Sequence, residues 1–343
     1  MRVAVRGGMC YTLGDWKGAC VGVIDAIADG CFAVARRPYV LIPPVALDLW
    51  YWLGERFTPA PLVEAFLRLA AAVQQAQPSP QEAVLTPAQV EAFRAVEGDF
   101  NLFWLLTSRG LRTLLPELAP GGVARPWPQG VLDVRAWPLV VLGALALALL
   151  GLFCLALYLA GVAQLVRDEP FDLRQLARRA PVYWLRLLGL VAIILGGLVL
   201  LGMPLILLLG ILTLVGVNVT ALLALFFFPL VWLYCYLALA PEAIVVSDVG
   251  PLRAIKLSVG IVRRNFWPVI GLLLATLLLT QGFPVLWQVV AGRVAGVPLA
   301  IAGNAFLGTG LTAAAMYFYK ERLAALEQAP VGGRQSAVDG RQS

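Results

Sequence analysis

The chain has 343 residues, of which 60 % are hydrophobic and only 13 % are charged, and its formal net charge is +6. Soluble domains carry about 25 % charged residues, and a water-soluble fold could not bury this much apolar surface, so the composition indicates a protein dissolved in a lipid bilayer. The chain has no histidine, which excludes Ser-His-Asp triads, histidine acid–base catalysis and histidine-ligated metals. We expect a non-enzymatic protein without a cofactor, whose basic residues meet membrane lipid and not nucleic acid.

Residues 1–37 are predicted to be a cytoplasmic N-terminus. They lack the apolar core of a cleavable signal peptide, so later segments must drive membrane insertion. Residues 24–36 have a helical repeat in which four apolar side chains oppose three charged ones. The apolar set is Ile24, Ile27, Cys31 and Val34, and the charged set is Asp25, Asp29 and Arg36.

Residues 38–54 are predicted to be the first of six spans. The segment is short and contains two prolines and Asp48. Arg36-Arg37 precede it and Trp50-Tyr51-Trp52 lie at its far end, as expected if basic and aromatic residues mark the two membrane interfaces.

Residues 55–136 are the only sizeable extramembrane region and are predicted to form a small helical cap on the outer face. A helical repeat covers Pro61–Gln75. Thr86, followed by a proline, starts a second helix that we expect to reach about Ser108. The apolar run Asn101–Leu106 is expected to lie on the membrane surface.

The predicted spans in the region 137–328 follow from stretches without a charged residue, because a spanning helix needs about 20 apolar residues. The three shorter stretches, each long enough for one span, are 136–166, 265–292 and 294–319. The stretch 187–241 would be about 80 Å long as a single helix. It is therefore predicted to hold two spans, near Leu185–Leu209 and Thr220–Val246, that turn at 216–218.

The distribution of Lys and Arg predicts the orientation of the chain. With the N-terminus inside, 18 of the 26 basic residues lie in inner segments, as the positive-inside rule requires. We expect a bacterial inner-membrane protein with both termini in the cytoplasm. The tail 329–343 is rich in Gly, Gln, Ser and Arg and is predicted to be a disordered cytoplasmic segment.

Three predicted cytoplasmic segments share one design, an amphipathic helix in the membrane plane followed by a proline or aromatic cluster and then a span. They are the N-terminal helix, residues 171–183 and residues 250–265. The predicted apolar faces of the last two are Leu173, Leu176 and Ala180, and Leu252, Ile255, Val259, Val262 and Phe266.

The polar faces of these segments are basic and supply a candidate lipid or partner surface. Its residues are Arg174, Arg178, Arg179, Arg253, Lys256, Arg263 and Arg264. A basic amphipathic helix buries apolar area in the interface and attracts anionic headgroups. The alternatives are a purely architectural anchor and ordinary cytoplasmic loops that obey the positive-inside rule.

Short motifs around the third segment resemble a known group of proteins. They are Pro241-Glu242-Ala243-Ile244-Val245-Val246, Gly250–Ser258, Arg264-Asn265-Phe266-Trp267 and the earlier Leu41–Trp50. On these motifs the chain resembles uncharacterised bacterial six-span integral membrane proteins related to the membrane domain of glycerophosphodiester phosphodiesterases. The resemblance covers about the membrane half of the chain and implies six spans. It carries over no catalytic residue, because the phosphodiesterase barrel and its histidines are absent from this sequence.

Asp48 is the only acid well inside a predicted span, and an intramembrane carboxylate is a functional candidate by default. The candidate intramembrane polar site is Asp48, Gln281, Gln288 and Asn304. The structural alternative for Asp48 is a capping role or an ion pair with an arginine such as Arg56 or Arg293. The amides ordinarily make interhelical hydrogen bonds, and Glu242 is expected to pair with a basic residue of the following helix.

The predicted fold is thus an all-α polytopic membrane bundle of six spans with in-plane helices inside and a helical cap outside. The first functional hypothesis is a protein that organises lipid or a partner through its basic helices. The second is a transporter or permease with a cleft between the repeated hairpins, and the third is an intramembrane enzyme. The sequence does not identify a substrate, a partner or an oligomeric state.

Overall fold

The structure of the chain is a computed structural model. It describes residues 22–76, 86–99, 101–107, 111, 113–114, 123–128, 130–132, 134, 136–215 and 220–328. The expectations for residues 1–21, for the turn at 216–218 and for the tail 329–343 lie outside the described residues.

The described elements are almost all helices, which confirms the expected all-α class. In chain order they are α1 (Val23–Arg36), η1 (Pro38–Leu41), α2 (Ile42–Leu53), β1 (Arg56–Phe57), α3 (Ala60–Ala76), α4 (Pro87–Asp99), η2 (Leu102–Thr107), β2 (Val131–Leu132), α5 (Trp137–Val166), α6 (Leu173–Leu214), α7 (Thr220–Leu237), α8 (Ala240–Val246), α9 (Pro251–Arg264), α10 (Phe266–Ala291), η4 (Val294–Gly296) and α11 (Val297–Gln328).

Within the described residues, five helical segments are long and apolar enough to cross a membrane. They are Trp137–Val166, Leu173–Leu212, Phe228–Val246, Phe266–Ala291 and Val294–Glu327. The predicted membrane character is therefore confirmed. The expected first span forms η1 and the 12-residue helix α2, which has proline in its first turn and ends at Gly54, so α2 alone is shorter than these five segments.

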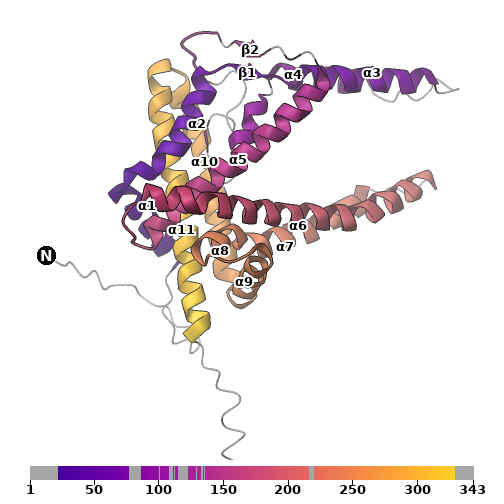
Figure 1. Cartoon of the computed structure of the whole chain (residues 1–343). Helices are drawn as coiled ribbons and strands as arrows, with labels where there is room; N and C mark the ends of the chain where they lie inside the picture. Colours follow the sequence, from indigo (N-terminus) through magenta and orange to yellow (C-terminus); the bar gives the residue numbers. More distant parts are fainter. Residues whose placement is uncertain are drawn as a thin grey trace, which may run out of the picture.

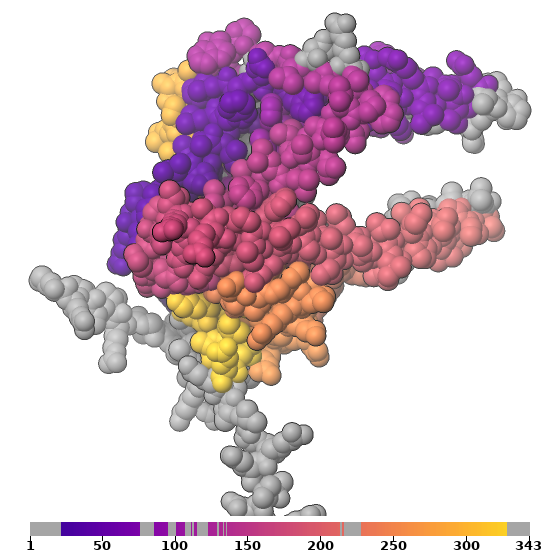
Figure 2. Space-filling view, in the orientation of Figure 1, coloured from indigo at the N-terminus to yellow at the C-terminus, as the bar shows by residue number. Residues whose placement is uncertain are grey.

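Helix α11 is the centre of the bundle and contacts α1, α2, α5, α8, α9 and α10 (Figure 1). The C-terminal ends of α2 and α10 and the N-terminal ends of α5 and α11 all lie toward the strand pair β1–β2. We call this the cap end. Helices α3 and α6 extend sideways from the bundle, and Figure 2 shows the molecule hollowed between these two arms.

The contact between α1 and α11 depends on two glycines. A β-carbon added at Gly30 would lie 2.3 Å from the carbonyl oxygen of Gly310 and 2.6 Å from the backbone nitrogen of Ala314. A β-carbon at Gly310 would lie 2.8 Å from Cys31 Sγ. Only glycine permits this approach, which is the way that small residues pack helices in membranes.

The buried face of α1 agrees with the predicted apolar face at Val34, and in part at Ile27, but not at Ile24. Its buried residues are Ala26, Gly30 and Val34, whereas Ile24 is 80 % exposed. In lipid a large apolar side chain gains little by moving against protein, since the acyl chains are equally apolar. The prediction treated α1 as an in-plane surface helix, but its small residues pack it directly against α11.

The expected in-plane helix at 171–183 is not a separate element. It is the first part of α6, which continues through Pro181. The buried residues Leu176, Ala180, Tyr183 and Leu187 share one face on both sides of the proline, and α6 packs there against α5. This packing holds the helix together across Pro181, whereas Leu173, another residue of the predicted apolar face, is exposed.

The cap region agrees with the sequence in its first two helices. Helix α3 matches the predicted Pro61–Gln75, and α4 begins after Thr86, whose Oγ1 accepts a hydrogen bond from the backbone N–H of Gln89 over 3.3 Å. Gln89 Oε1 in turn accepts from the backbone N–H of Thr86 over 2.8 Å, a reciprocal cap of the kind that starts helices. Helix α4 ends at Asp99, earlier than the predicted Ser108.

The run Asn101–Leu106, which was expected on the membrane surface, packs partly into the protein. Leu102 and Leu106 are buried, and a β-carbon at Gly151 of α5 would lie 2.3 Å from the carbonyl oxygen of Leu105. Because Gly151 has no side chain, the backbone of Leu105 and Leu106 can pack directly against α5. The short parallel pair β1–β2, which the sequence analysis did not predict, joins the two ends of the cap region.

Replacing Gly30 with alanine is expected to destabilise the protein by about 2 kcal/mol or more, because the added methyl group meets backbone atoms that cannot rotate away. The matched control is Gly196→Ala in α6, where an added β-carbon meets nothing within 4 Å. Thermal unfolding in detergent measures both variants. Equal unfolding midpoints for the two variants would contradict the glycine contact.

Candidate functional site: a basic surface and a buried carboxylate

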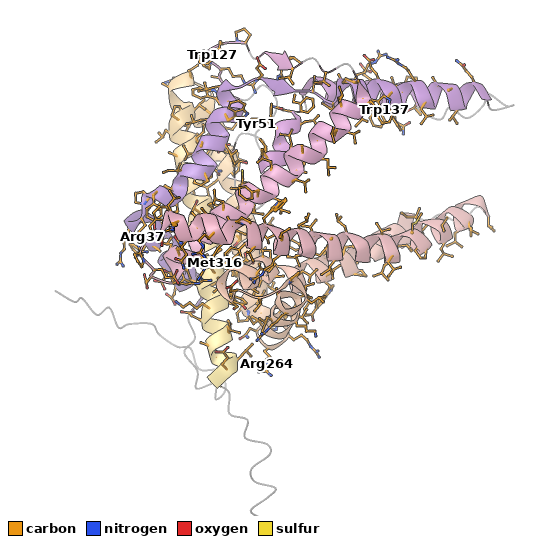
Figure 3. All side chains as sticks on the ribbon, viewed as in Figure 1. Arg37, Tyr51, Trp127, Trp137, Arg264 and Met316 are labelled. Atoms are coloured by element: carbon orange, nitrogen blue, oxygen red, sulfur yellow. The ribbon has the colours of Figure 1, made fainter. Side chains whose placement is uncertain are left out.

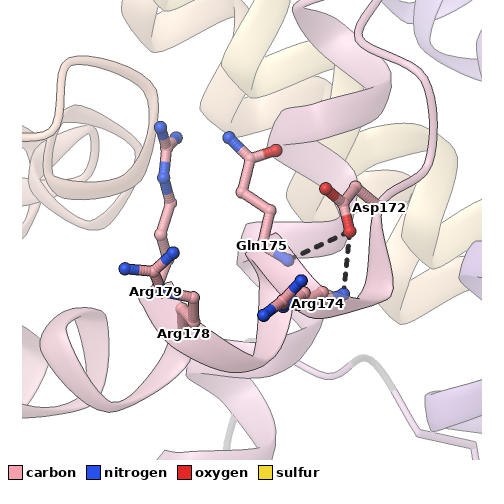
Figure 4. A pocket seen from close by; sticks show the side chains of 5 residues that line it. All are labelled: Asp172, Arg174, Gln175, Arg178 and Arg179. Atoms are coloured by element: carbon pink, nitrogen blue, oxygen red, sulfur yellow. Dashed lines mark hydrogen bonds between the residues drawn. The ribbon is translucent and has the colours of Figure 1, made fainter.

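A pocket at the start of α6 brings together three of the predicted basic residues. Its volume is about 600 Å³, and it is lined by Asp172, Arg174, Gln175, Arg178 and Arg179. Figure 4 shows Gln175 and Arg179 extending from the helix toward the same side. The buried residues Leu176 and Ala180 fix the opposite face of α6 and thereby turn these arginines outward.

Asp172, the one carboxylate in the pocket lining, is already engaged by the backbone. Its Oδ1 accepts hydrogen bonds from the N–H groups of Arg174 and Gln175, over 2.9 and 3.1 Å. It acts as the N-cap of α6. The pocket therefore combines three guanidinium groups with one carboxylate, and Oδ1 of that carboxylate is hydrogen-bonded to backbone N–H groups in the first turn of α6.

The other four basic residues lie on α9, a separate helix as predicted. Arg253, Lys256, Arg263 and Arg264 are exposed. The buried face consists of Ala254, Ser258, Ile261 and Val262. Of the predicted apolar face, Val262 is buried and Ile255 and Phe266 are half-buried against the core, while Leu252 is 65 % exposed.

Small residues again explain which face of α9 is buried. Ser258 Oγ donates a hydrogen bond to the carbonyl oxygen of Tyr236 in α7 over 2.7 Å, and Ala254 is fully buried beside it on the same face. Helix α9 packs against α6, α7, α8, α10 and α11. It therefore rests on protein on one side, and its opposite side carries the cations.

One ion pair links the two groups of cations. Arg186 of α6 pairs with Asp248, just before α9, and a β-carbon at Gly189 would lie 3.1 Å from Pro251 Cγ. Within the part of the chain that the structure describes, no carboxylate pairs with any of the seven predicted basic residues. We call these seven residues the basic surface, and Figure 3 places Arg264 far from Trp127 and Trp137 of the cap end.

Three further cations, outside the predicted basic residues of α6 and α9, bind backbone carbonyls near helix ends. Lys320 Nζ donates to the carbonyl oxygen of Val166 over 3.1 Å, and a guanidinium nitrogen of Arg167 donates to that of Val246 over 3.0 Å. Arg37 donates to the carbonyl oxygen of Glu169 over 2.7 Å. Cations are favoured at helix C-termini, and the position of Arg167 directly after α5 is a signal that the sequence did contain.

Asp48 is fully buried in α2. Its two carboxylate oxygens accept hydrogen bonds from the backbone N–H of Leu114, over 3.0 and 2.9 Å. This contact ties the cap region to α2. A carboxylate that accepts a hydrogen bond from a backbone N–H corresponds to the capping role that was one alternative for Asp48. Leu111 and Leu114 are also buried, so the carboxylate satisfies a backbone group that water does not reach.

The four members of the predicted intramembrane polar site have different surroundings. Asn304 is buried in α11, the helix against which α2 packs, while Gln281 is exposed and Gln288 is half-buried in α10. Helix packing thus buries Asp48 and Asn304 but leaves Gln281 at the outside. Glu242 lies in the first turn of α8, where a negative charge is favoured by the helix dipole.

Replacing Asp48 with alanine is expected to lower the free energy of unfolding by about 1–3 kcal/mol, because the Leu114 N–H stays buried without this acceptor. Asp48→Asn retains an acceptor oxygen of similar shape and should keep most of the stability. Thermal unfolding of the purified variants separates the two cases. The capping account fails if asparagine destabilises the protein as much as alanine does.

Comparisons of the chain with protein-family models, with curated proteins and with solved structures found no match.

Proposed function

We propose that this chain is a non-enzymatic inner-membrane protein of six spans, with α2 as the first, and that its basic surface binds the phosphate of anionic phospholipid headgroups. The observation that carries the proposal is the pocket of Arg174, Arg178 and Arg179 beside a carboxylate already bound by the helix start. The proposal places the basic surface and both termini in the cytoplasm, in accordance with the positive-inside rule.

The chemistry of the pocket favours phosphate. Guanidinium groups match phosphate oxygens with paired N–H donors, and among the described residues no carboxylate forms an ion pair with these arginines, so their N–H donors remain available to a headgroup phosphate. Each Lys or Arg near an anionic membrane surface contributes about 1 kcal/mol. Four exposed cations on α9 extend the attraction beyond the pocket, and the protein would in this way gather anionic lipid or hold a partner at that surface.

Changing Arg178 and Arg179 together to glutamine is expected to weaken binding of phosphatidylglycerol by about tenfold or more, because two charges are lost. Arg263→Gln with Arg264→Gln should act in the same direction. Titration of the detergent-solubilised protein with short-chain phosphatidylglycerol, at low and at high salt, measures the effect, and phosphatidylcholine serves as the neutral lipid.

A matched control removes two exposed arginines elsewhere. Arg68 pairs with Glu64 in α3, and Arg293 lies after α10 at the cap end. The combined variant Arg68→Gln and Arg293→Gln should bind phosphatidylglycerol as the native chain does. If the control variant loses as much affinity as Arg178→Gln with Arg179→Gln, or if salt has no effect, the proposed site is wrong.

The second candidate is a transporter, favoured by one observation, the fully buried carboxylate of Asp48. A titratable group at such a position suits a proton relay. The distinguishing measurement is proton flux into proteoliposomes under an imposed membrane potential. Flux that disappears in Asp48→Asn, with the fold retained, would favour the transporter, and the absence of flux in the native chain would count against it.

A further inference from the structure

Helix α3 leaves the bundle at the cap end and carries an apolar stripe that is exposed among the residues that the structure describes. It extends sideways (Figures 1 and 2) and contacts α4 and α5. The stripe consists of Leu62, Phe66, Leu69 and Val73, which are 40 to 63 % exposed. Their spacing of four, three and four residues places them on one face of the helix.

The opposite face of α3 is polar. Glu64 and Arg68 lie there, joined by an ion pair of 2.7 Å and largely exposed. Phe93 of α4 extends the apolar stripe, since its ring centroid is 5.2 Å from that of Phe66 and its side chain is also exposed. Helix α3 therefore has one face suited to hydrocarbon and one suited to water.

The depth of α3 follows from its attachment to α5. Phe57, three residues before α3, is buried, and a β-carbon at Gly143 of α5 would lie 2.9 Å from its ring. Gly143 lies six residues inside the span that begins at Trp137. The start of α3 is thus held beside the first turns of a membrane span, not at a distance from the bilayer.

Aromatic residues mark the same level. Trp50, Trp104, Trp127 and Trp137 are each 40 to 54 % exposed, and Figure 3 shows Trp127 and Trp137 at the end of the molecule where α3 lies. Exposed tryptophans are enriched where membrane meets water. The surface of α5 directly beyond Trp137 is lined by exposed Leu139, Leu142 and Leu145, and α3 contacts this helix.

We infer that α3 lies in the plane of the membrane interface at the cap end, with Leu62, Phe66, Leu69 and Val73 in the acyl-chain region and Glu64 and Arg68 in water. The partner of this surface is the lipid bilayer itself. An amphipathic helix in this position buries its apolar face about 5–10 Å into the headgroup and acyl boundary. The stripe would then anchor the cap region to the leaflet opposite the basic surface.

The experiment places a fluorophore on each face of α3 in the full chain. Single cysteines replace Leu69 and Arg68 in a variant whose five native cysteines are alanine, after its unfolding midpoint has been matched to that of the native chain. The proteins are reconstituted in vesicles of phosphatidylcholine and phosphatidylglycerol. One quencher is a nitroxide on the acyl chain, and the other is aqueous iodide.

The expected result is at least about twofold stronger nitroxide quenching at position 69 than at position 68, with iodide giving the opposite order, since one face enters the acyl boundary. If Leu69→Cys does not fold, Val73→Cys and Gln75→Cys repeat the comparison one turn on. Equal iodide quenching on both faces would overturn the inference. A position 69 probe that neither reagent reaches would also overturn it, because protein would then cover the stripe.

Discussion

The fold depends on the close approach of α1 to α11 at Gly30 and Gly310. A β-carbon at Gly30 would overlap backbone atoms of α11, so this contact exists only because both positions lack a side chain. Helix α11 in turn contacts α2, α5, α8, α9 and α10, and the contact with α1 therefore fixes an N-terminal helix to the centre of the bundle. Lipid supplies no hydrophobic force between helices, so the packing of small residues takes its place.

The same constraint separates what the sequence predicted from what it did not. Charge-free length identified the five helical segments that could cross a membrane, and Thr86 with Gln89 identified the start of α4, because length and capping are local properties. The faces of α1 and α9 were assigned by hydrophobicity, which is the rule for helices in water. The structure buries Ala26 and Gly30, and Ala254 and Ser258, and turns Ile24 and Leu252 outward. A glycine such as Gly151, against which the Leu105 backbone packs, predicts a close contact only when the segment that packs against it is known.

Some charged side chains bind groups within the protein, and those of the basic surface are left available to bind a ligand. Lys320, Arg167 and Arg37 bind carbonyl oxygens near the ends of α5 and α8, and Asp48 binds the backbone of the cap region. These charges act within the protein. Those of the basic surface have no carboxylate partner among the described residues and point outward. The basic surface and the apolar stripe of α3 would thus meet lipid at opposite ends of the bundle.

The most direct test of the central contact uses a native cysteine. A β-carbon at Gly310 would lie 2.8 Å from Cys31 Sγ, so a cysteine placed at position 310 has its sulfur within bonding reach of Cys31. Burial raises the pKa of the Cys31 thiol, so alkaline pH is used to form the thiolate, and an added mild oxidant then takes up the two electrons released when the disulfide forms. The account predicts an intramolecular disulfide between residues 31 and 310 in Gly310→Cys, found by mass spectrometry of peptides, and none between residues 31 and 196 in Gly196→Cys. A folded Gly310→Cys protein in which both thiols stay free would contradict it.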